Sequence, residues 1–294
     1  MIHLSSIDKK FFIRIIESVK GMCYNAKKGE KGELAMTKPI MGIQLYTLRD
    51  HIRTAEDFDN TLGRLRALGV TDVQISGIGD FSAQEQAAAL EKHGMKVCVT
   101  HKSFDRMKTD LDAMIAEHKT IGCDAMGIGS APDEGRGSYK AVRGFIDEAQ
   151  EIGKKLRENG MTFNYHNHAF EFYRLGDKAC GMMDVLLSES DSELFHFIPD
   201  VAWIHYAGAD PVEILKKMKG RVKVLHFKDY VIEDNLDRKF VSLGKGLVDL
   251  KACYEAACEL DIPYIMYEQD SDWVDGDAFK AVEESWAFMQ SLQK

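Results

Sequence analysis

Short apolar runs alternate with segments of helical periodicity from residue 40 to the end of the chain, at spacings of about 25–35 residues. Each apolar run has roughly the length of a buried strand, about five residues. Helix boundaries are marked between them: Ser82 and Glu85 match a capping box, and Gly94 stands where a helix would close. The expected strands cover residues 40–45, 72–76, 96–100, 124–128, 161–165, 194–199, 221–225 and 262–267.

The segments between these strands predict one helix after each strand. They cover residues 54–68, 82–94, 108–120, 138–158, 178–187, 211–218, 250–260 and 277–292. Eight strand–helix units in about 255 residues are the count and size of an α/β protein with a (β/α)8 TIM barrel. An open doubly wound sheet is less well supported, because no glycine-rich phosphate loop follows any strand.

The first 36 residues differ from the rest of the chain. Residues 11–16 form an apolar run that is too short and too interrupted for the core of a signal peptide. Residues 27–33 are charged and contain glycine, a composition typical of disorder. We therefore expect residues 1–36 to be a disordered appendage or a mis-assigned start, with Met36 as the natural first residue. Residues 37–294 are expected to form a single barrel domain.

Composition argues against several classes of protein. The net charge is −9 and no basic run exceeds a few residues, whereas a nucleic-acid-binding protein normally carries a basic stripe. No segment approaches the roughly 18 apolar residues that a membrane span requires. The six cysteines are scattered without a CxxC motif, which is typical of reduced thiols in a cytoplasmic protein. We expect a cytoplasmic protein that binds neither nucleic acid nor membrane, with a homo-oligomer left open.

Residues that bind metals or move protons stand at the ends of the last four expected strands. These residues are His166, Asp200, His226 and Glu268. Because the carboxyl ends of parallel barrel strands share one mouth, we expect the four side chains to converge there. Mixed imidazole and carboxylate ligands suit Mn²⁺, Zn²⁺, Co²⁺ or Fe²⁺ better than Ca²⁺. A hydrogen-bonded polar rim without a metal ion is the alternative.

Other side chains at the strand ends are candidates for catalysis or substrate binding. His101 is a candidate acid or base across the barrel mouth, and Lys228 could stabilise an enediolate oxygen or protonate a leaving hydroxyl. A simple salt bridge between Lys228 and Asp229 is the structural alternative. Trp203 offers an aromatic face to a sugar or packs in the core. The candidates for hydrogen bonds to substrate hydroxyls are Gln44, Gln74 and Asn167.

Several motifs resemble the xylose-isomerase-like TIM barrels, in the branch of the sugar phosphate isomerases and epimerases. They are YHNHAFEF (165–172), DVAW (200–203), AGADP (207–211), GRV (220–222), HFKD (226–229) and YEQD (267–270). The similarity runs from about residue 40 to the C-terminus. The resemblance implies one divalent ion held by Asp200, His226, Glu268 and a fourth ligand. Mn²⁺ is favoured, with Zn²⁺, Co²⁺, Fe²⁺ or Mg²⁺ as alternatives.

The position of the fourth ligand departs from the pattern of the family. Ketose epimerases of this family have a glutamate there, and their two glutamates remove and return the substrate proton. The corresponding residue in this chain is His166. Since a neutral imidazole bound to a metal is a poor base, epimerisation by two glutamates is not expected. His168 and Glu171 are alternatives for the fourth ligand or for the missing base, and Glu171 is also a candidate for substrate binding.

The resemblance implies an isomerase or epimerase that acts on a small sugar, keto-sugar or polyol. Its mechanism would be proton abstraction next to a carbonyl that the metal polarises, with Glu268 as ligand and base. One alternative is a dehydratase or lyase acting on an inosose-like ketone or a 3-keto-glycoside. Another is a non-catalytic sugar-binding barrel or partner subunit. The family also includes an endonuclease, but the acidic composition of this chain disfavours DNA as a ligand.

Overall fold

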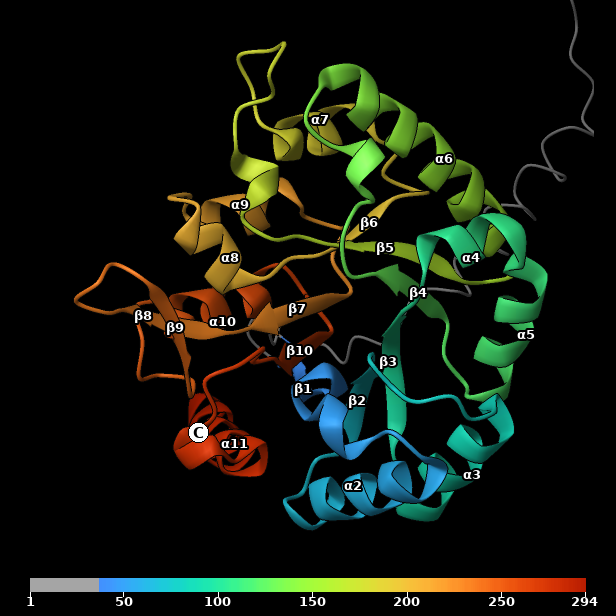
Figure 1. Ribbon diagram of the computed structural model, residues 1–294, viewed down its shortest axis with the longest axis vertical. Helices are drawn as coiled ribbons and strands as arrows, with labels where there is room; N and C mark the ends of the chain where they lie inside the picture. Colours follow the sequence, from blue (N-terminus) through green and yellow to red (C-terminus); the bar gives the residue numbers. More distant parts are fainter. Residues whose placement is uncertain (1–36) are drawn as a thin grey trace, which may run out of the picture. The chain divides into compact units, whose positions relative to one another are not determined.

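The computed structural model describes residues 37–294, and the predictions made for residues 1–36 lie outside the described part. Thr37–Lys294 form one compact unit. Eight parallel strands form a nearly closed barrel with helices around it, as the sequence predicts (Figure 1). In their order around the sheet the strands are β6 His196–Ile198, β5 Thr162–His166, β4 Ala125–Ile128, β3 Lys96–His101, β2 Asp72–Ile75, β1 Ile40–Gln44, β10 Tyr264–Tyr267 and β7 Val224–Phe227.

The barrel closes between β6 and β7 through isolated parallel bridges rather than a continuous ladder. One bridge joins Phe197 to Val222, and the other joins Asp200 to His226. The His226 N–H donates to the carbonyl of Pro199 at 2.8 Å. The closure therefore brings two of the expected metal ligands together at the mouth of the barrel.

The helices cover the outside of the barrel (Figure 1). They are α2 Ala55–Ala67, α3 Ala83–His93, α4 Phe104–Thr109, α5 Leu111–Thr120, α6 Tyr139–Glu158, α7 Met182–Glu189, α8 Val201–Tyr206, α9 Pro211–Lys217, α10 Leu250–Glu259 and α11 Ala278–Leu292. The boundaries predicted for α3 are confirmed. Ser82 and Glu85 form a reciprocal capping box, and Gly94 ends the helix in the left-handed conformation with φ +60°.

Two predicted helices differ from the structure. Residues 108–120 are not one helix but the end of α4 and the whole of α5, because the backbone of Asp110 leaves the helical region with φ −141° and ψ 35°. The helix expected at 178–187 begins only at Met182. There the Gly181 N–H donates to the carboxylate of Asp184 at 3.0 Å, which fixes the start of α7.

The sequence patterns did not predict α8 or a β-hairpin that follows β7. The hairpin consists of β8 Asp229–Ile232 and β9 Arg238–Val241, and it projects from the barrel at the left of Figure 1. The Asp229 carboxylate anchors it by accepting the N–H groups of Gly244 at 3.1 Å, Gly246 at 2.9 Å and Val248 at 3.1 Å. Asp229 thus organises a loop and forms no salt bridge with Lys228.

The barrel interior is filled below the strand ends by a small apolar cluster. It contains Cys98, Val99, Ala125, Ile198, Val224 and Met266. Several of these residues stand two or three positions before the polar residues at the strand ends, so the apolar plug leaves the mouth of the barrel to the polar side chains. Within residues 37–294, the helices are too short or too polar to cross a membrane.

Candidate active site

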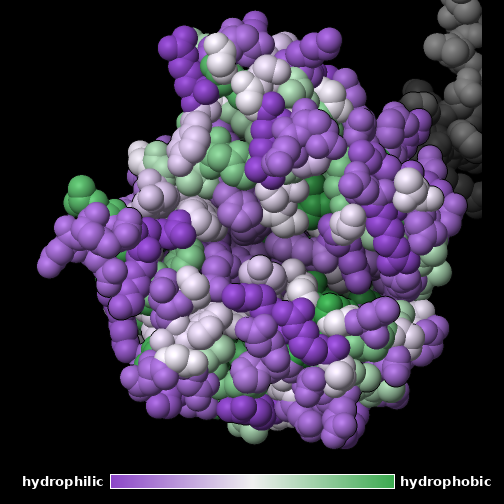
Figure 2. Space-filling model, in the orientation of Figure 1, coloured by the Kyte–Doolittle hydropathy of each residue, from purple (hydrophilic) through white to green (hydrophobic). Residues whose placement is uncertain are grey.

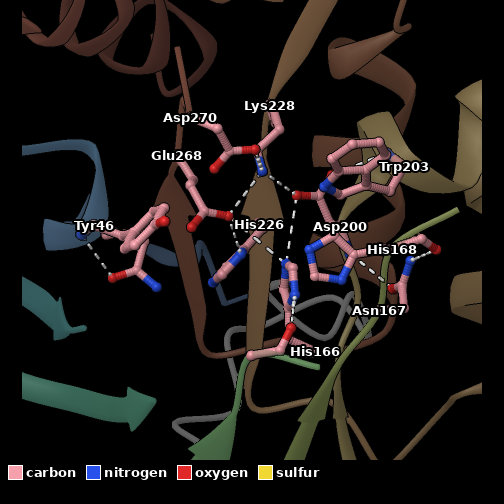
Figure 3. A network of polar contacts seen from close by, with 12 residues as sticks. Tyr46, His166, Asn167, His168, Asp200, Trp203, His226, Lys228, Glu268 and Asp270 are labelled. Carbon is pink, nitrogen blue, oxygen red and sulfur yellow. Dashed lines mark hydrogen bonds and ion pairs between the residues drawn. The ribbon is translucent and has the colours of Figure 1, made fainter. Parts of the chain in front are cut away.

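Four buried side chains from neighbouring strand ends meet at the mouth of the barrel (Figure 3). They are His166 of β5, Asp200 after β6, His226 of β7 and Glu268 after β10. Each residue offers one ligand atom, and these atoms lie within 4.8 Å of one another. The structure therefore brings together the four residues that the sequence predicts as metal ligands.

Asp200 is held with one carboxylate oxygen directed to the protein and the other to the cluster. Its N–H donates to Oδ1 of Asn167 at 3.0 Å. Its own Oδ1 accepts the N–H groups of Ala202 at 2.9 Å and Trp203 at 3.0 Å, which starts α8. Its Oδ2 lies in the cluster, 3.5 Å from Nε2 of His166 and 3.1 Å from Nζ of Lys228. Asn167, expected to bind substrate hydroxyls, instead positions Asp200.

His166 directs its Nε2 to two carboxylates. Its Nδ1 lies 3.0 Å from the carbonyl oxygen of Gly129, which can only accept, so Nδ1 carries the proton. Its Nε2 has no hydrogen-bond partner and lies 3.7 Å from Oε2 of Glu268. At this nitrogen either a proton or a metal ion balances the charge of the two carboxylates. Burial opposes a proton on Nε2, but the Asp200 and Glu268 carboxylates outweigh it and raise the pKa of His166.

His226 is oriented in the same way by a glutamine. Its Nε2 donates to Oε1 of Gln74 at 2.7 Å, which leaves the Nδ1 lone pair 3.0 Å from Oε2 of Glu268. Gln74 is fully buried and lies behind the imidazole, so it acts on the ligand cluster rather than on substrate hydroxyls. Gln44 is also fully buried, and its Oε1 accepts the N–H of Tyr46 at 3.3 Å.

The donor set fits a divalent transition-metal ion. Two imidazole nitrogens and two carboxylate oxygens are common ligands of Zn²⁺, Mn²⁺ and Fe²⁺. Ligand atoms that share one ion at about 2.1 Å lie roughly 3–3.5 Å apart. The separations of 3.0, 3.5 and 3.7 Å among the four side chains are close to this range. Such an ion would satisfy Nε2 of His166, which has no hydrogen-bond partner, and it would share Oδ2 of Asp200 with Lys228.

Lys228 is fully buried beside the ligand cluster and is paired with three carboxylates. Its Nζ lies 3.1 Å from Oδ2 of Asp200, 3.0 Å from Oε2 of Glu268 and 2.8 Å from Oδ2 of Asp270. Burial disfavours the ammonium, but the carboxylates of Asp200, Asp270 and Glu268 outweigh it and raise the pKa of Lys228 well above its usual value. Lys228 is therefore a fixed cation in the site.

A cavity of about 360 Å³ opens onto these groups. Figure 2 shows the hollow at the centre of this face, among mainly hydrophilic residues. The lining residues are Tyr46, Ser76, His101, Gly129, His166, His168, Lys228, Glu268 and Asp270. Asp200 and His226 lie deeper, at the floor of the site, since both are fully buried.

Two further imidazoles line this cavity as neutral groups. Burial and then the neighbouring His166 lower the pKa of His168 to about 3. The same two causes lower the pKa of His101 well below its usual value. Nε2 of His101 and Nδ1 of His168 have no hydrogen-bond partner, so both nitrogens are available to a ligand in the cavity.

Trp203 and Glu171, predicted to bind substrate, do not line the cavity. Glu171 is fully buried and accepts the Tyr165 hydroxyl at 2.6 Å and the His168 N–H at 2.9 Å, so it positions the turn that carries His168. Trp203 packs against His168, with ring centroids 5.3 Å apart, and its face lies 5.5 Å from Nζ of Lys228.

Sequence reasoning did not assign a site role to four of the lining residues. They are Tyr46, Ser76, Gly129 and Asp270. A signal existed for Asp270, because it stands two positions after Glu268, at the same strand end. Tyr46 and Ser76 follow β1 and β2, where single tyrosines and serines carry little information.

Curated relatives are similar to parts of the chain only. An inosose dehydratase from Clostridium botulinum is 35% identical over 78 residues, which cover 26% of this chain and 25% of that protein. An inosose dehydratase from Clostridium beijerinckii is 30% identical over 140 residues, covering 48% of this chain and 41% of that protein. The chain thus spans a quarter to less than half of the length of these relatives.

Similarity in structure covers nearly the whole described chain. A sugar phosphate isomerase/epimerase from Parabacteroides distasonis superimposes with a TM-score of 0.73 at 22% identity, over 88% of this chain and 98% of that one. At this identity the likeness concerns the fold alone. Residues 62–292 match the family described as "Xylose isomerase-like TIM barrel". The chain belongs to the xylose isomerase-like TIM barrel family.

Proposed function

We propose that this protein is a divalent-metal-dependent enzyme that removes a proton next to the carbonyl of a small keto-sugar or cyclic polyol ketone, and that loss of water follows. The observation that carries the proposal is the arrangement around Glu268. Its Oε2 belongs to the ligand cluster, and the Lys228 ammonium lies 3.0 Å away. A candidate base and a fixed cation thus share one wall of the cavity.

A divalent ion held by His166, Asp200, His226 and Glu268 would polarise a substrate carbonyl and make the adjacent C–H more acidic, an effect worth several kcal/mol. Glu268 is suited to take that proton. Its Oε2 contacts His166, His226 and Lys228, whereas its Oε1 has no hydrogen-bond partner among residues 37–294. Burial opposes ionisation, but Lys228 and His226 outweigh it and lower the pKa of Glu268 well below its usual value, so the carboxylate is ionised.

Lys228 is suited to stabilise the negative charge that develops on oxygen. Its pKa is raised, so it keeps its proton in the resting site and acts as a charged hydrogen-bond donor to an enolate oxygen or a departing hydroxyl. Asp270 is outside the ligand cluster and lies 2.8 Å from Nζ, so it keeps Lys228 oriented whether or not an ion is bound.

Dehydration is favoured over epimerisation by the identity of residue 166. Inverting a carbon centre needs a base on one face of the substrate and an acid on the other. In this chain the position that would carry a second carboxylate holds His166, whose Nδ1 donates to Gly129 and whose Nε2 faces the ligand cluster. Elimination requires only one base and a group that assists the leaving hydroxyl. The partial similarity to inosose dehydratases supports the same assignment.

Isomerisation or epimerisation is the second candidate, and the two imidazoles of the cavity favour it. His101 and His168 each have a free nitrogen and line the cavity with Glu268. An imidazole on the other face could return the proton to the substrate. The pKa of about 3 for His168 weakens this candidate, because an imidazole that resists protonation seldom carries the proton to be returned.

The two candidates leave different products in deuterated water. The metal-loaded protein would be incubated with a panel of ketoses, inososes and 3-keto-glycosides, and the products analysed by mass spectrometry and NMR. Dehydration gives a product lighter by one water, with a new conjugated carbonyl. Isomerisation gives a product that keeps its composition and acquires deuterium at the carbon next to the carbonyl. A product that has lost no water and carries deuterium contradicts dehydration and supports the second candidate.

A non-catalytic barrel is separated from both enzymes by Glu268→Gln. The amide keeps the size of the side chain but removes the base, so an enzyme loses turnover while its circular dichroism spectrum stays unchanged. A binding barrel turns over no member of the panel and changes only its affinity. Turnover that survives Glu268→Gln contradicts the role proposed for Glu268.

A further inference from the structure

A second cavity adjoins the candidate active site and is larger, at about 850 Å³. Ser76 and His101 line both cavities, so the two lie side by side at these side chains. The second cavity lies outside the barrel mouth, between the segment that links β2 to α3 and the segment that links β3 to α4. The volumes of both cavities lie within the usual range for a small-molecule site, about 300–1,000 Å³. A substrate whose carbonyl is in the first cavity can therefore extend into the second.

Most charged side chains in the second cavity are already paired. Glu117 accepts two hydrogen bonds from the Arg106 guanidinium, at 3.0 and 2.5 Å, and Arg106 also binds Asp110 at 3.0 Å. Glu85 accepts the N–H of Ser82 at 2.8 Å and its hydroxyl at 2.7 Å within the capping box. These groups have little capacity left for a ligand.

Lys102 is the exception among the cations of this cavity. It is partly buried, yet within residues 37–294 its ammonium has no carboxylate within 4.0 Å and no hydrogen-bond acceptor. Burial lowers its pKa, as expected for a cation that has lost water without gaining a partner. Its backbone N–H donates to the Gly127 carbonyl at 2.8 Å, which fixes the root of the side chain at the end of β3. Lys102 lines the second cavity, and His101, the residue before it, lines both.

Asp80 and Glu85 also line this cavity without a cationic partner among residues 37–294, and both are exposed to solvent. Water and salt screen their charges more than they screen the partly buried Lys102. These two carboxylates therefore oppose a ligand that carries more than one negative charge. One available cation among screened anions matches a ligand with a single negative charge better than a dianion.

We propose that the second cavity binds the far end of the substrate through a single carboxylate, with the Lys102 ammonium as its counter-charge. Lys102 is then a specificity-determining residue that selects sugar acids over neutral sugars. This inference rests on the proposed function, because it takes the reacting end of the substrate to lie in the first cavity, against Glu268 and Lys228. The carboxylate takes no part in the reaction.

The test measures binding to the Mn²⁺-loaded protein by calorimetry, with D-glucuronate, D-glucose and D-glucose 6-phosphate as probes at constant pH and ionic strength. Lys102→Met removes the charge and keeps the apolar stem. Lys96→Met is the matched control, because Lys96 is exposed at the opposite end of the same strand. A charge-assisted hydrogen bond predicts that the wild type binds glucuronate at least about tenfold more tightly than glucose.

The expected result is that Lys102→Met reduces this preference to about one, whereas Lys96→Met retains it. A preference that survives Lys102→Met overturns the inference, and so does equal binding of the two sugars by the wild type. Tighter binding of the phosphate ester than of glucuronate contradicts a site matched to one charge. A protein that binds Mn²⁺ but none of the three probes also overturns the inference. Neither that result nor equal binding of glucose and glucuronate contradicts the proposed function, which concerns ketone substrates and is tested by turnover of the ketose and inosose panel.

Discussion

The ammonium group of Lys228 lies 3.0 Å from Oε2 of Glu268, inside the cluster of candidate metal ligands. The same nitrogen lies 3.1 Å from Oδ2 of Asp200. Lys228 and a divalent ion would thus attract the same two carboxylate oxygens. The charge of Lys228 stabilises the site without a metal ion, and it opposes the ion when one binds.

Lys228→Met is therefore expected to have opposite effects on stability and on metal affinity. Without metal, the buried carboxylates lose their counter-charge, and the free energy of unfolding falls by about 3–5 kcal/mol. Affinity for Mn²⁺ rises, because a competing cation is gone. Turnover falls by about 100-fold or more, since the stabiliser of oxygen charge is lost. Urea unfolding with and without Mn²⁺ and metal titration measure these effects. Weaker Mn²⁺ binding by the variant contradicts the competition.

Gln74→Leu is expected to weaken metal binding although Gln74 is not a ligand. The Gln74 Oε1 accepts the Nε2–H of His226 and so directs the Nδ1 lone pair to the cluster. Loss of such a supporting contact typically costs about 10–100-fold in metal affinity. The measurement is a Mn²⁺ titration, with the exposed Gln84→Leu as the control. Unchanged affinity in Gln74→Leu contradicts the role assigned to Gln74.

The free energy of unfolding is expected to decrease as the pH falls, because His118 is buried in its neutral form. It is fully buried, its Nδ1 donates to the Met114 carbonyl at 2.7 Å and its Nε2 accepts from the Thr100 hydroxyl at 2.7 Å. Burial is the main cause that lowers its pKa to about 4. In the unfolded chain the pKa of histidine is about 6.5. Between these values the unfolded state binds the proton, so stability falls as the pH drops from about 6.5 to 4, by up to about 3 kcal/mol.

His118→Gln tests this dependence by urea unfolding at pH 7 and pH 5. The variant loses hydrogen bonds and is less stable at pH 7, but its own loss of stability between the two pH values is smaller than that of the wild type. Equal losses in the two proteins contradict a buried neutral His118.

The barrel could be predicted because its signals are local and repeat along the chain. Apolar runs of strand length recur eight times, capping boxes and closing glycines mark some of the helices between them, and the boundaries of α3 show how well such signals locate an element. The elements that the sequence did not predict are those without a repeating pattern. The six-residue α8 is too short to show helical periodicity and exists because Asp200 caps it. The β8–β9 hairpin depends on Asp229 binding backbone groups well beyond it in the sequence.

The ligand set could be predicted because its residues stand directly at strand ends, where topology alone brings them together. The supporting contacts could not be predicted. Gln74 and His226 are 152 positions apart, and Lys228 pairs with Asp270 across 42 positions rather than with the adjacent Asp229. Such contacts depend on side-chain direction and on the register around the barrel, which no local pattern encodes.

The central claim is that His166, Asp200, His226 and Glu268 hold one divalent ion. The most direct test is a calorimetric titration of the metal-free protein with Mn²⁺ and Co²⁺, with the double variant His226→Ala/Glu268→Gln in parallel. We predict one ion per chain for the wild type and no measurable binding by the double variant, while the circular dichroism spectra of both show a folded barrel. A folded wild-type protein that binds no ion, or a double variant that binds as tightly as the wild type, contradicts the account.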